Sequence, residues 1–168
     1  NMLATSTHDS KRSEDARARI NVLSEIPAAW KLMLKRWRRL NRGRKHLVDG
    51  VEAPSRNDEY LLYQTLVGTW PLTPPNDEEL ADYRTRIDAY MIKALREGKE
   101  HSSWVQVNSE YEGAVSDFVN ALLAPGDKNL FLADFVLMLQ TISHHGLINA
   151  LAQALIKVTS PGVPDIYQ

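Results

Sequence analysis

The sequence predicts a mostly α-helical domain, and three observations support this fold class. Of the 168 residues, 43% are hydrophobic and 24% are charged, a composition typical of a chain that folds around one core. Apolar residues recur at helical spacing along most of the chain, and prolines and glycines separate these segments. Only the stretches 2–7 and 163–167 resemble strands, and neither can form a sheet alone. Two solitary strands suggest a piece of a larger protein, so we expect a helical bundle with short strand-like ends.

Two helices are predicted in the first quarter of the chain. The first begins at 13–15, Ser-Glu-Asp, because acidic residues favour the positive end of the helix dipole. Pro27 begins the second, since proline is favourable in a first turn. Its apolar residues have the spacing of a buried stripe: Trp30, Met33, Leu34, Trp37 and Leu40. A polar connection flanked by Gly43 and Gly50 is expected to follow.

Two more helices are predicted in the middle of the chain. Asn57 is expected to cap the first, and the three prolines of 69–76 require a turn after it. The next helix covers about 77–96, and Gly98 is a plausible stop. The apolar face of that helix consists of Leu80, Tyr83, Ile87, Tyr90, Met91 and Leu95.

The last third of the chain predicts three helical segments. Asn108 or Ser109 caps the first, whose apolar residues are Tyr111, Val115, Phe118, Val119 and Leu122. After a turn at 125–127, two segments follow at about 129–143 and 146–158. Both are apolar nearly all round, which is typical of buried helices.

Composition excludes several classes of site and location. There is no Cys, so the chain has no disulfide and no thiolate metal site, and a reducing, cytoplasmic location is expected. No apolar run approaches ~18 residues, so no membrane span or membrane partner is expected. A net charge of −1 argues against a polyanion-binding chain as a whole.

The histidines do not form a recognisable metal motif. His144 and His145 are adjacent, so both cannot easily reach one ion, and they are expected at a helix end or turn. His46 and His101 lie in polar surroundings and are expected to be solvated. No metalloprotease, P-loop or nucleophile-elbow motif occurs, and we expect neither metal nor cofactor.

A basic block at 31–45 carries eight cations and no acidic residue. In a helix that buries the tryptophan stripe, the cations Lys31, Lys35, Arg36, Arg38 and Arg39 are exposed. A solvated or ion-paired face is the simplest interpretation. The alternative is a helical module that binds nucleic acid or protein, although its aromatic residues would be buried and unable to stack on bases.

The densest chemical feature is the run Thr7-His8-Asp9-Ser10-Lys11-Arg12, directly after a strand-like stretch. One interpretation is a strand end followed by a capped helix. The other is a substrate site at the carboxyl end of a strand, where α/β barrels keep their chemistry.

The two ends of the chain resemble motifs of the α-amylase superfamily. T-H-D-S at 7–10 is similar to its strand-seven motif, and P-G-V-P-D-I-Y-Q at 161–168 is similar to its strand-eight motif. The segments T-H-D-S-K-R-S-E-D-A-R-A-R-I-N-V-L-S-E (7–25), N-D-E-Y-L-L-Y-Q-T-L-V-G (57–68) and F-L-A-D-F (131–135) resemble the maltooligosyl trehalose synthase family. Ser10 departs mildly from the Thr usual there.

This resemblance implies a larger (β/α)8-barrel enzyme that acts on maltooligosaccharides. It would convert the α-1,4 link at the reducing end into an α,α-1,1 link by intramolecular transglucosylation with retention. Residues 1–10 would then end strand seven, residues 11–145 would form a helical insertion, and residues 146–168 would hold the returning helix and strand eight.

The resemblance also implies roles for four residues. Asp9 would be catalytic, stabilising positive charge at the anomeric carbon, and His8 would hydrogen-bond the same sugar. Lys11 and Arg12 belong to the family's extended motif and are expected to bind substrate or keep Asp9 ionised. The nucleophile and the acid/base residue would come from earlier strands, so this chain alone is expected to be inactive.

Two further expectations concern partners and specificity. Without the barrel, the apolar segments 136–139 and 147–156 would be uncovered, so the isolated chain is expected to self-associate. Another α-glucan hydrolase or transglycosylase of the same superfamily stays open as an alternative, since the same carboxylates serve those reactions.

Overall fold

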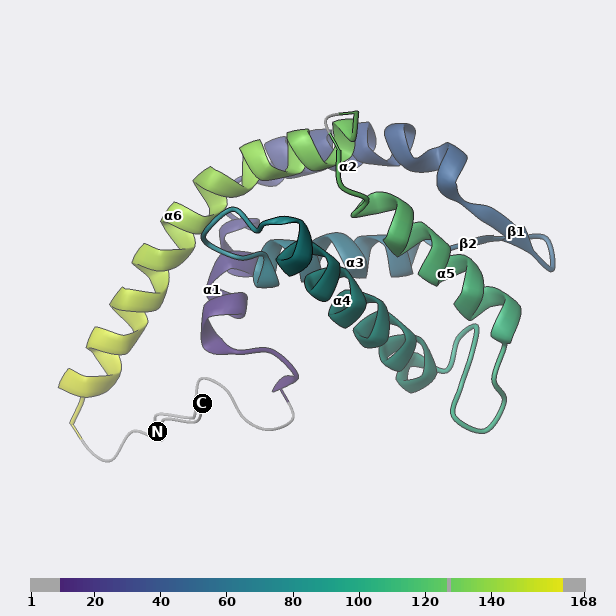
Figure 1. The fold of residues 1–168 in the computed structure, drawn as a ribbon. Helices are drawn as coiled ribbons and strands as arrows, with labels where there is room; N and C mark the ends of the chain where they lie inside the picture. Colours follow the sequence, from purple (N-terminus) through teal and green to yellow (C-terminus); the bar gives the residue numbers. More distant parts are fainter. Residues whose placement is uncertain (1–9, 127, 162–168) are drawn as a thin grey trace.

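The computed structural model describes residues 10–126 and 128–161, and there the chain is mostly helical, as predicted. The elements in order are α1 (Glu14–Val22), α2 (Pro27–Asn41), the 3₁₀ turn η2 (Arg42–Arg44), β1 (His46–Val48), β2 (Val51–Ala53), α3 (Arg56–Thr69), α4 (Asp77–Gly98), α5 (Ser109–Leu122) and α6 (Leu130–Thr159). Figure 1 shows α2 and α6 along the top of the bundle, with α3, α4 and α5 beneath and the β-hairpin at one end. The predicted strands at 2–7 and 163–167 lie outside the described residues.

Most helices begin where their capping residues predict. The Ser13 hydroxyl caps α1, Pro27 is the first residue of α2, and the Asn108 side chain caps α5. The cap predicted at Asn57 is wrong, because Ser55, two residues earlier, is the N-cap of α3 and its hydroxyl accepts the backbone N–H of Asp58. Both residue types can cap, and the pattern of apolar residues did not separate them.

A β-hairpin occupies the region predicted as a polar connection. Its strands pair antiparallel, with Val48 opposite Val51. Asp49 and Gly50 between them have φ values of 51° and 79°, which is the turn geometry that matches the twist of the strands. The Asp-Gly pair between two valines was the available signal, but strands of three residues are too short to show alternation.

An aromatic cluster forms the centre of the core. Trp37 has no exposed surface, and its ring centroid lies 5.3 Å from that of Tyr63 in α3 and 5.4 Å from that of Phe131 in α6. Trp30 packs edge-on against Trp37. These edge-to-face contacts add to the burial of large apolar rings, and they confirm the stripe predicted for α2.

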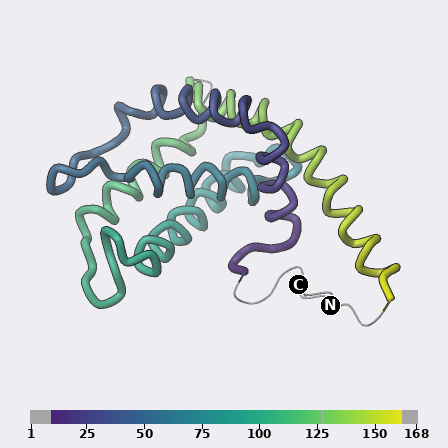
Figure 2. Tube along the Cα trace, turned by 180° about the vertical axis from the view of Figure 1, so that it is seen from behind, coloured from purple at the N-terminus to yellow at the C-terminus, as the bar shows by residue number. Residues whose placement is uncertain are grey.

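The last helix, α6, is continuous over 30 residues, so the helix end or turn predicted at His144 and His145 is wrong. A glycine inside a helix costs only about 1 kcal/mol, and Gly146 is used here for close packing. Its Cα lies against Arg19 of α1, where a side chain would not fit. Figure 2 shows the C-terminal half of α6 extending past the rest of the bundle.

That C-terminal half of α6 is exposed along one side, which agrees with the uncovered segment expected at 147–156 and not with burial all round. Its exposed aliphatic side chains are Leu147, Ile148, Leu151, Leu155, Ile156 and Val158. Of the other segment expected to be uncovered, 136–139, Leu137 is exposed but Leu139 is buried. By length and composition alone, α6 is long and apolar enough to cross a membrane, so the prediction that no apolar segment reaches this length is wrong. A single such helix is weak evidence for a membrane span, because core helices of soluble proteins meet the same criteria. The first half of α6 lies in the core of this bundle.

The packing of α6 on α1 can be tested with two glycines. Gly146→Ala should destabilise the fold by about 1–3 kcal/mol, because its Cβ would lie 2.7 Å from Cγ and 3.0 Å from Cα of Arg19. Gly113→Ala in α5 is the matched control: its Cβ meets nothing within 4 Å, so helix propensity should stabilise the fold by up to about 1 kcal/mol. Urea unfolding followed by circular dichroism measures both. Stabilisation by both variants would contradict the close packing of these helices.

Candidate functional site

The segment after the T-H-D-S motif carries one exposed cation and one anchored cation. His8 and Asp9 lie outside the described residues. Lys11 is exposed and has a positive φ of 59°, whereas Arg12 is half-buried. Ser10 accepts a hydrogen bond from Arg17 of α1 at 3.2 Å. The residues that follow Asp9 are therefore tied to the bundle.

Arg12 joins this segment to two helices. Its Nη2 donates to the Thr65 hydroxyl in α3 at 2.9 Å and to the Tyr90 hydroxyl in α4 at 3.3 Å. The guanidinium carbon also lies 5.7 Å from the centroid of the Tyr90 ring, within cation–π range. Among the described residues, its other guanidinium nitrogens form no hydrogen bond. Arg12 is thus held in place and keeps further N–H groups that can donate to a ligand.

These contacts border a hollow of about 280 Å³, which we call the Arg12 hollow. It is lined by Lys11, Arg12, Ser13, Ala16, Thr65, Thr69, Tyr83, Arg86, Ile87 and Tyr90. Hydroxyl and guanidinium groups predominate, and none of these lining residues is a carboxylate. The hollow offers hydrogen bonds and aromatic edges to a polar ligand, but its described walls supply no pair of acid/base groups.

Tyr83 is a hydrogen-bonding group in this hollow and not a base. Its hydroxyl lies 2.8 Å from that of Thr69. Burial raises the pKa of Tyr83 to about 12, so the phenol stays protonated at neutral pH. It can donate one hydrogen bond and accept others.

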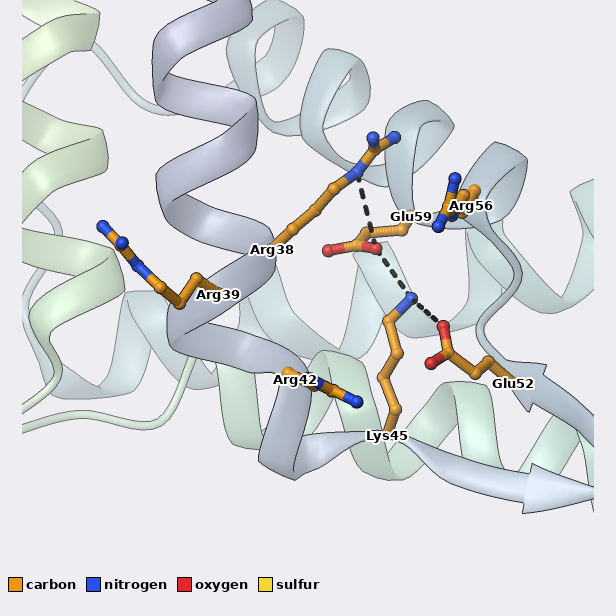
Figure 3. A pocket seen from close by; sticks show the side chains of 7 residues that line it. All are labelled: Arg38, Arg39, Arg42, Lys45, Glu52, Arg56 and Glu59. Carbon is orange, nitrogen blue, oxygen red and sulfur yellow. Dashed lines mark ion pairs between the residues drawn. The ribbon is translucent and has the colours of Figure 1, made fainter.

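Four of the five cations predicted to be exposed on α2 are exposed, namely Lys31, Lys35, Arg36 and Arg39, whereas Arg38 is half-buried. Arg36 pairs with Asp134 of α6. Further cations surround a second hollow of about 490 Å³, the basic hollow, shown in Figure 3. It is lined by Arg38, Arg39, Arg42, Lys45, Glu52, Arg56 and Glu59.

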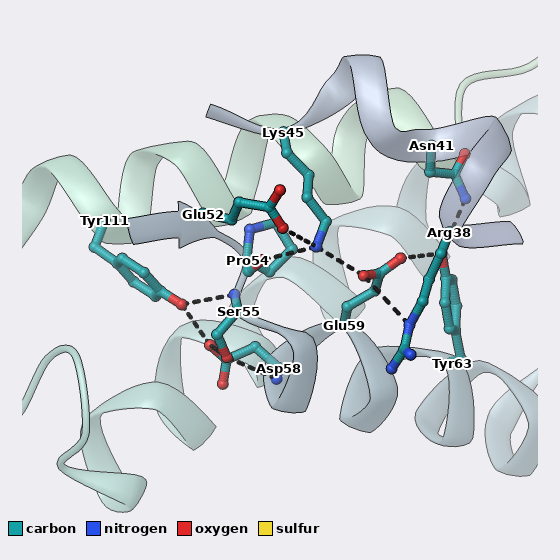
Figure 4. A network of polar contacts seen from close by, with 10 residues as sticks. All are labelled: Arg38, Asn41, Lys45, Glu52, Pro54, Ser55, Asp58, Glu59, Tyr63 and Tyr111. Atoms are coloured by element: carbon teal, nitrogen blue, oxygen red, sulfur yellow. Dashed lines mark hydrogen bonds and ion pairs between the residues drawn. The ribbon is translucent and has the colours of Figure 1, made fainter. Parts of the chain in front are cut away.

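A buried carboxylate that the sequence did not predict, Glu59, lies at the base of this hollow and is only 1% exposed. Lys45 Nζ lies 2.7 Å from one of its oxygens, and Tyr63 donates to the other at 2.8 Å (Figure 4). Asn41 donates in turn to the Tyr63 hydroxyl. Burial and the Glu59 charge raise the pKa of Tyr63, so it remains a donor. Position 59 lies one turn before Tyr63 on the buried face, which was the available signal.

The histidines do not gather into a site. His144 and His145 are exposed within α6, and no group of three His, Asp or Glu residues in 10–126 and 128–161 could hold a metal ion. His46 is exposed, as predicted. The prediction for His101 is wrong, because its ring stacks on Tyr111 at 4.5 Å and its side chain is only 21% exposed.

The chain is similar over nearly its whole length to maltooligosyl trehalose synthases. A Mycobacterium tuberculosis protein with that provisional name is 33% identical over 167 residues, which are 99% of this chain and 20% of that protein. The crystal structure of the Sulfolobus tokodaii hypothetical maltooligosyl trehalose synthase matches with a TM-score of 0.80 and 37% identity, over 100% of this chain and 21% of the other. The Arthrobacter ramosus maltooligosyltrehalose synthase matches with a TM-score of 0.76 and 30% identity, over 100% and 19%. No protein-family model matches the chain.

The chain therefore spans about a fifth of the length of the proteins it resembles. The likeness includes the helical bundle itself, since the superposition covers α1 to α6. Its similarity to these enzymes along the whole chain confirms the resemblance identified from the motifs.

The buried carboxylate can be tested with a double-mutant cycle. Lys45→Met should destabilise the fold by about 3–5 kcal/mol, because it leaves Glu59 buried without its nearest cation. Adding Glu59→Gln removes the uncompensated charge, so the double variant should recover part of that loss. Denaturant unfolding at constant ionic strength measures each variant. Additive losses from Lys45→Met and Glu59→Gln would contradict coupling between the two residues.

Proposed function

We propose that this chain is a segment of a maltooligosyl trehalose synthase, and that the longer protein rearranges the reducing end of maltooligosaccharides. The observation that supports this most strongly is the likeness to such enzymes over the entire bundle, at 30–40% identity and TM-scores of 0.76–0.82. The reaction would replace the terminal α-1,4 link by an α,α-1,1 link within one molecule, making the enzyme an intramolecular transferase of the isomerase class.

In this proposal the T-H-D-S motif and the Arg12 hollow serve substrate binding. Asp9 stabilises positive charge at the anomeric carbon, and His8 hydrogen-bonds the same sugar ring. Lys11 and Arg12 bind further sugar hydroxyls. The anchoring of Arg12 on Thr65 and Tyr90 supports this role, because a held guanidinium loses little freedom when it binds.

The same chemistry limits what the chain can do by itself. Retaining transfer needs a nucleophilic carboxylate and an acid/base carboxyl group ~5 Å apart. The described walls of the Arg12 hollow contain neither. In the proposal both groups belong to other parts of the longer protein, and the similar Mycobacterium tuberculosis protein is about five times the length of this chain.

Two alternatives are less well supported. Hydrolysis or another transglycosylation of α-glucans would use the same carboxylates, but the similar proteins are named as synthases. A nucleic-acid or protein interaction module would use the basic block at 31–45. Its tryptophans, however, are buried in the core and cannot stack on bases.

The 168-residue chain is expected to leave maltopentaose unchanged, since in this proposal the two carboxylates that exchange the bond belong to other parts of the longer protein. Chromatography of the sugars after long incubation measures this. Detectable trehalose-ended product or shorter sugars from the purified chain would contradict the proposal.

A chimera tests the role of the motif within a complete enzyme. This chain replaces the matching fifth of the Arthrobacter ramosus enzyme, and the chimera is assayed for trehalose-ended product. Asp9→Asn should lower kcat by about 10²–10³-fold, the size of effect seen when charge stabilisation is removed. Asp117→Asn, at an exposed carboxylate of α5, is the control and should change little. Near-normal kcat for Asp9→Asn would remove Asp9 from the catalytic residues.

We also propose that the isolated chain self-associates through the exposed half of α6. Leu151 and Leu155 lie one turn apart there, and each is 62% exposed. Sedimentation should show concentration-dependent association, and Leu151→Gln with Leu155→Gln should weaken it. Leu72→Gln, an exposed leucine elsewhere, is the control. A clean monomer at high concentration would contradict this expectation.

A further inference from the structure

The basic hollow carries a surplus of positive charge that the proposed glucan chemistry does not need. Its lining carries five cations and two carboxylates, a surplus of three positive charges in a concave space of about 490 Å³. Pockets that bind small molecules commonly measure about 300–1,000 Å³. The hollow lies between α2, η2 and the start of α3, whereas the Arg12 hollow lies between α1, α3 and α4.

The two carboxylates are already engaged by Lys45. Glu59 lies 2.7 Å from Lys45 Nζ, and Glu52 lies 3.6 Å from the same nitrogen. Arg38 Nε also lies near Glu59, at the longer distance of 3.9 Å from its carboxylate. Lys45 also donates to the carbonyl of Pro54 and is itself only 8% exposed, so it is held at the base of the hollow (Figure 4). The acidic side chains therefore do not neutralise the remaining arginines.

Three guanidinium groups are left for a ligand. Arg39, Arg42 and Arg56 are exposed, and in the described part of the chain none of them forms an ion pair or side-chain hydrogen bond. They come from α2, η2 and the first turn of α3 (Figure 3). Guanidinium groups present several donors in a rigid plane that matches phosphate oxygens.

We propose that the basic hollow binds a small polyanion of the phosphate class, with Arg39, Arg42 and Arg56 as its ligands. A small ligand suits the concave shape, and no described residue that lines the hollow is aromatic, so the hollow offers no platform for nucleic-acid bases. The proposal is independent of the glucan chemistry above, because the two hollows share no lining residue.

Calorimetric titration of the 168-residue chain with inorganic pyrophosphate tests this, at constant ionic strength because exposed charges are screened by salt. Arg42→Gln and Arg56→Gln together should weaken the pyrophosphate Kd by about tenfold or more. Lys31→Gln and Lys35→Gln, which remove the same charge from the same basic block outside the hollow, should change the Kd less than twofold. Circular dichroism checks that each variant folds, and all four positions are exposed.

Three results would overturn the proposal. The first is that pyrophosphate does not bind. The second is that both pairs of substitutions weaken binding equally, which indicates a general effect of charge. The third is that an oligonucleotide binds with a steep dependence on salt while pyrophosphate does not bind, which favours a nucleic-acid module. Binding that is weakened by the Arg42 and Arg56 substitutions but not by the Lys31 and Lys35 substitutions supports the assigned site.

Discussion

The buried carboxylate of Glu59 is the constraint around which this end of the bundle is organised. A charge that is removed from water must be paired and hydrogen-bonded, or it destabilises the fold by several kcal/mol. Lys45 supplies the charge and Tyr63 supplies the hydrogen bond. Because Lys45 lies between η2 and β1, pairing it with α3 brings the start of the hairpin against the bundle. Tyr63 then connects this polar group to the aromatic cluster, since its ring packs on Trp37.

Helix α1 holds the segment that follows the T-H-D-S motif in a defined place. A glycine lies at its contact with each neighbouring helix: Gly68 of α3 against Ala16, and Gly146 of α6 against Arg19. Arg19 also donates to the carbonyl of Trp70 at 2.6 Å. Close approach of backbones at both contacts fixes α1 against its neighbours, and Arg12, which lies just before α1, is held by Thr65 of α3 and Tyr90 of α4.

The sequence predicted the features of the fold that depend on local capping chemistry and on the periodicity of apolar residues. The capping residues and the stripe of Trp30 and Trp37 were found because propensity and burial point to the same answer there. The hairpin was missed because three-residue strands have no measurable alternation. Glu59 was missed because a carboxylate normally faces water, and its burial depends on a lysine 14 positions away. The Arg12 hollow could not be found at all, since it joins segments separated by up to 78 positions.

Hydropathy alone predicted that both halves of α6 are buried, but the two halves have different surroundings. Along the first half, Phe131, Phe135 and Ile142 are enclosed by the bundle. Along the second, one side is held against α1 by Gly146 and by Lys157, whose ammonium lies 2.7 Å from Glu14. The other side keeps its leucines and isoleucines uncovered by any described residue. Such a strip is stable in water only when something covers it, and the similar proteins are long enough to supply the cover. The apolar character of the second half of α6 therefore fits a contact beyond this bundle.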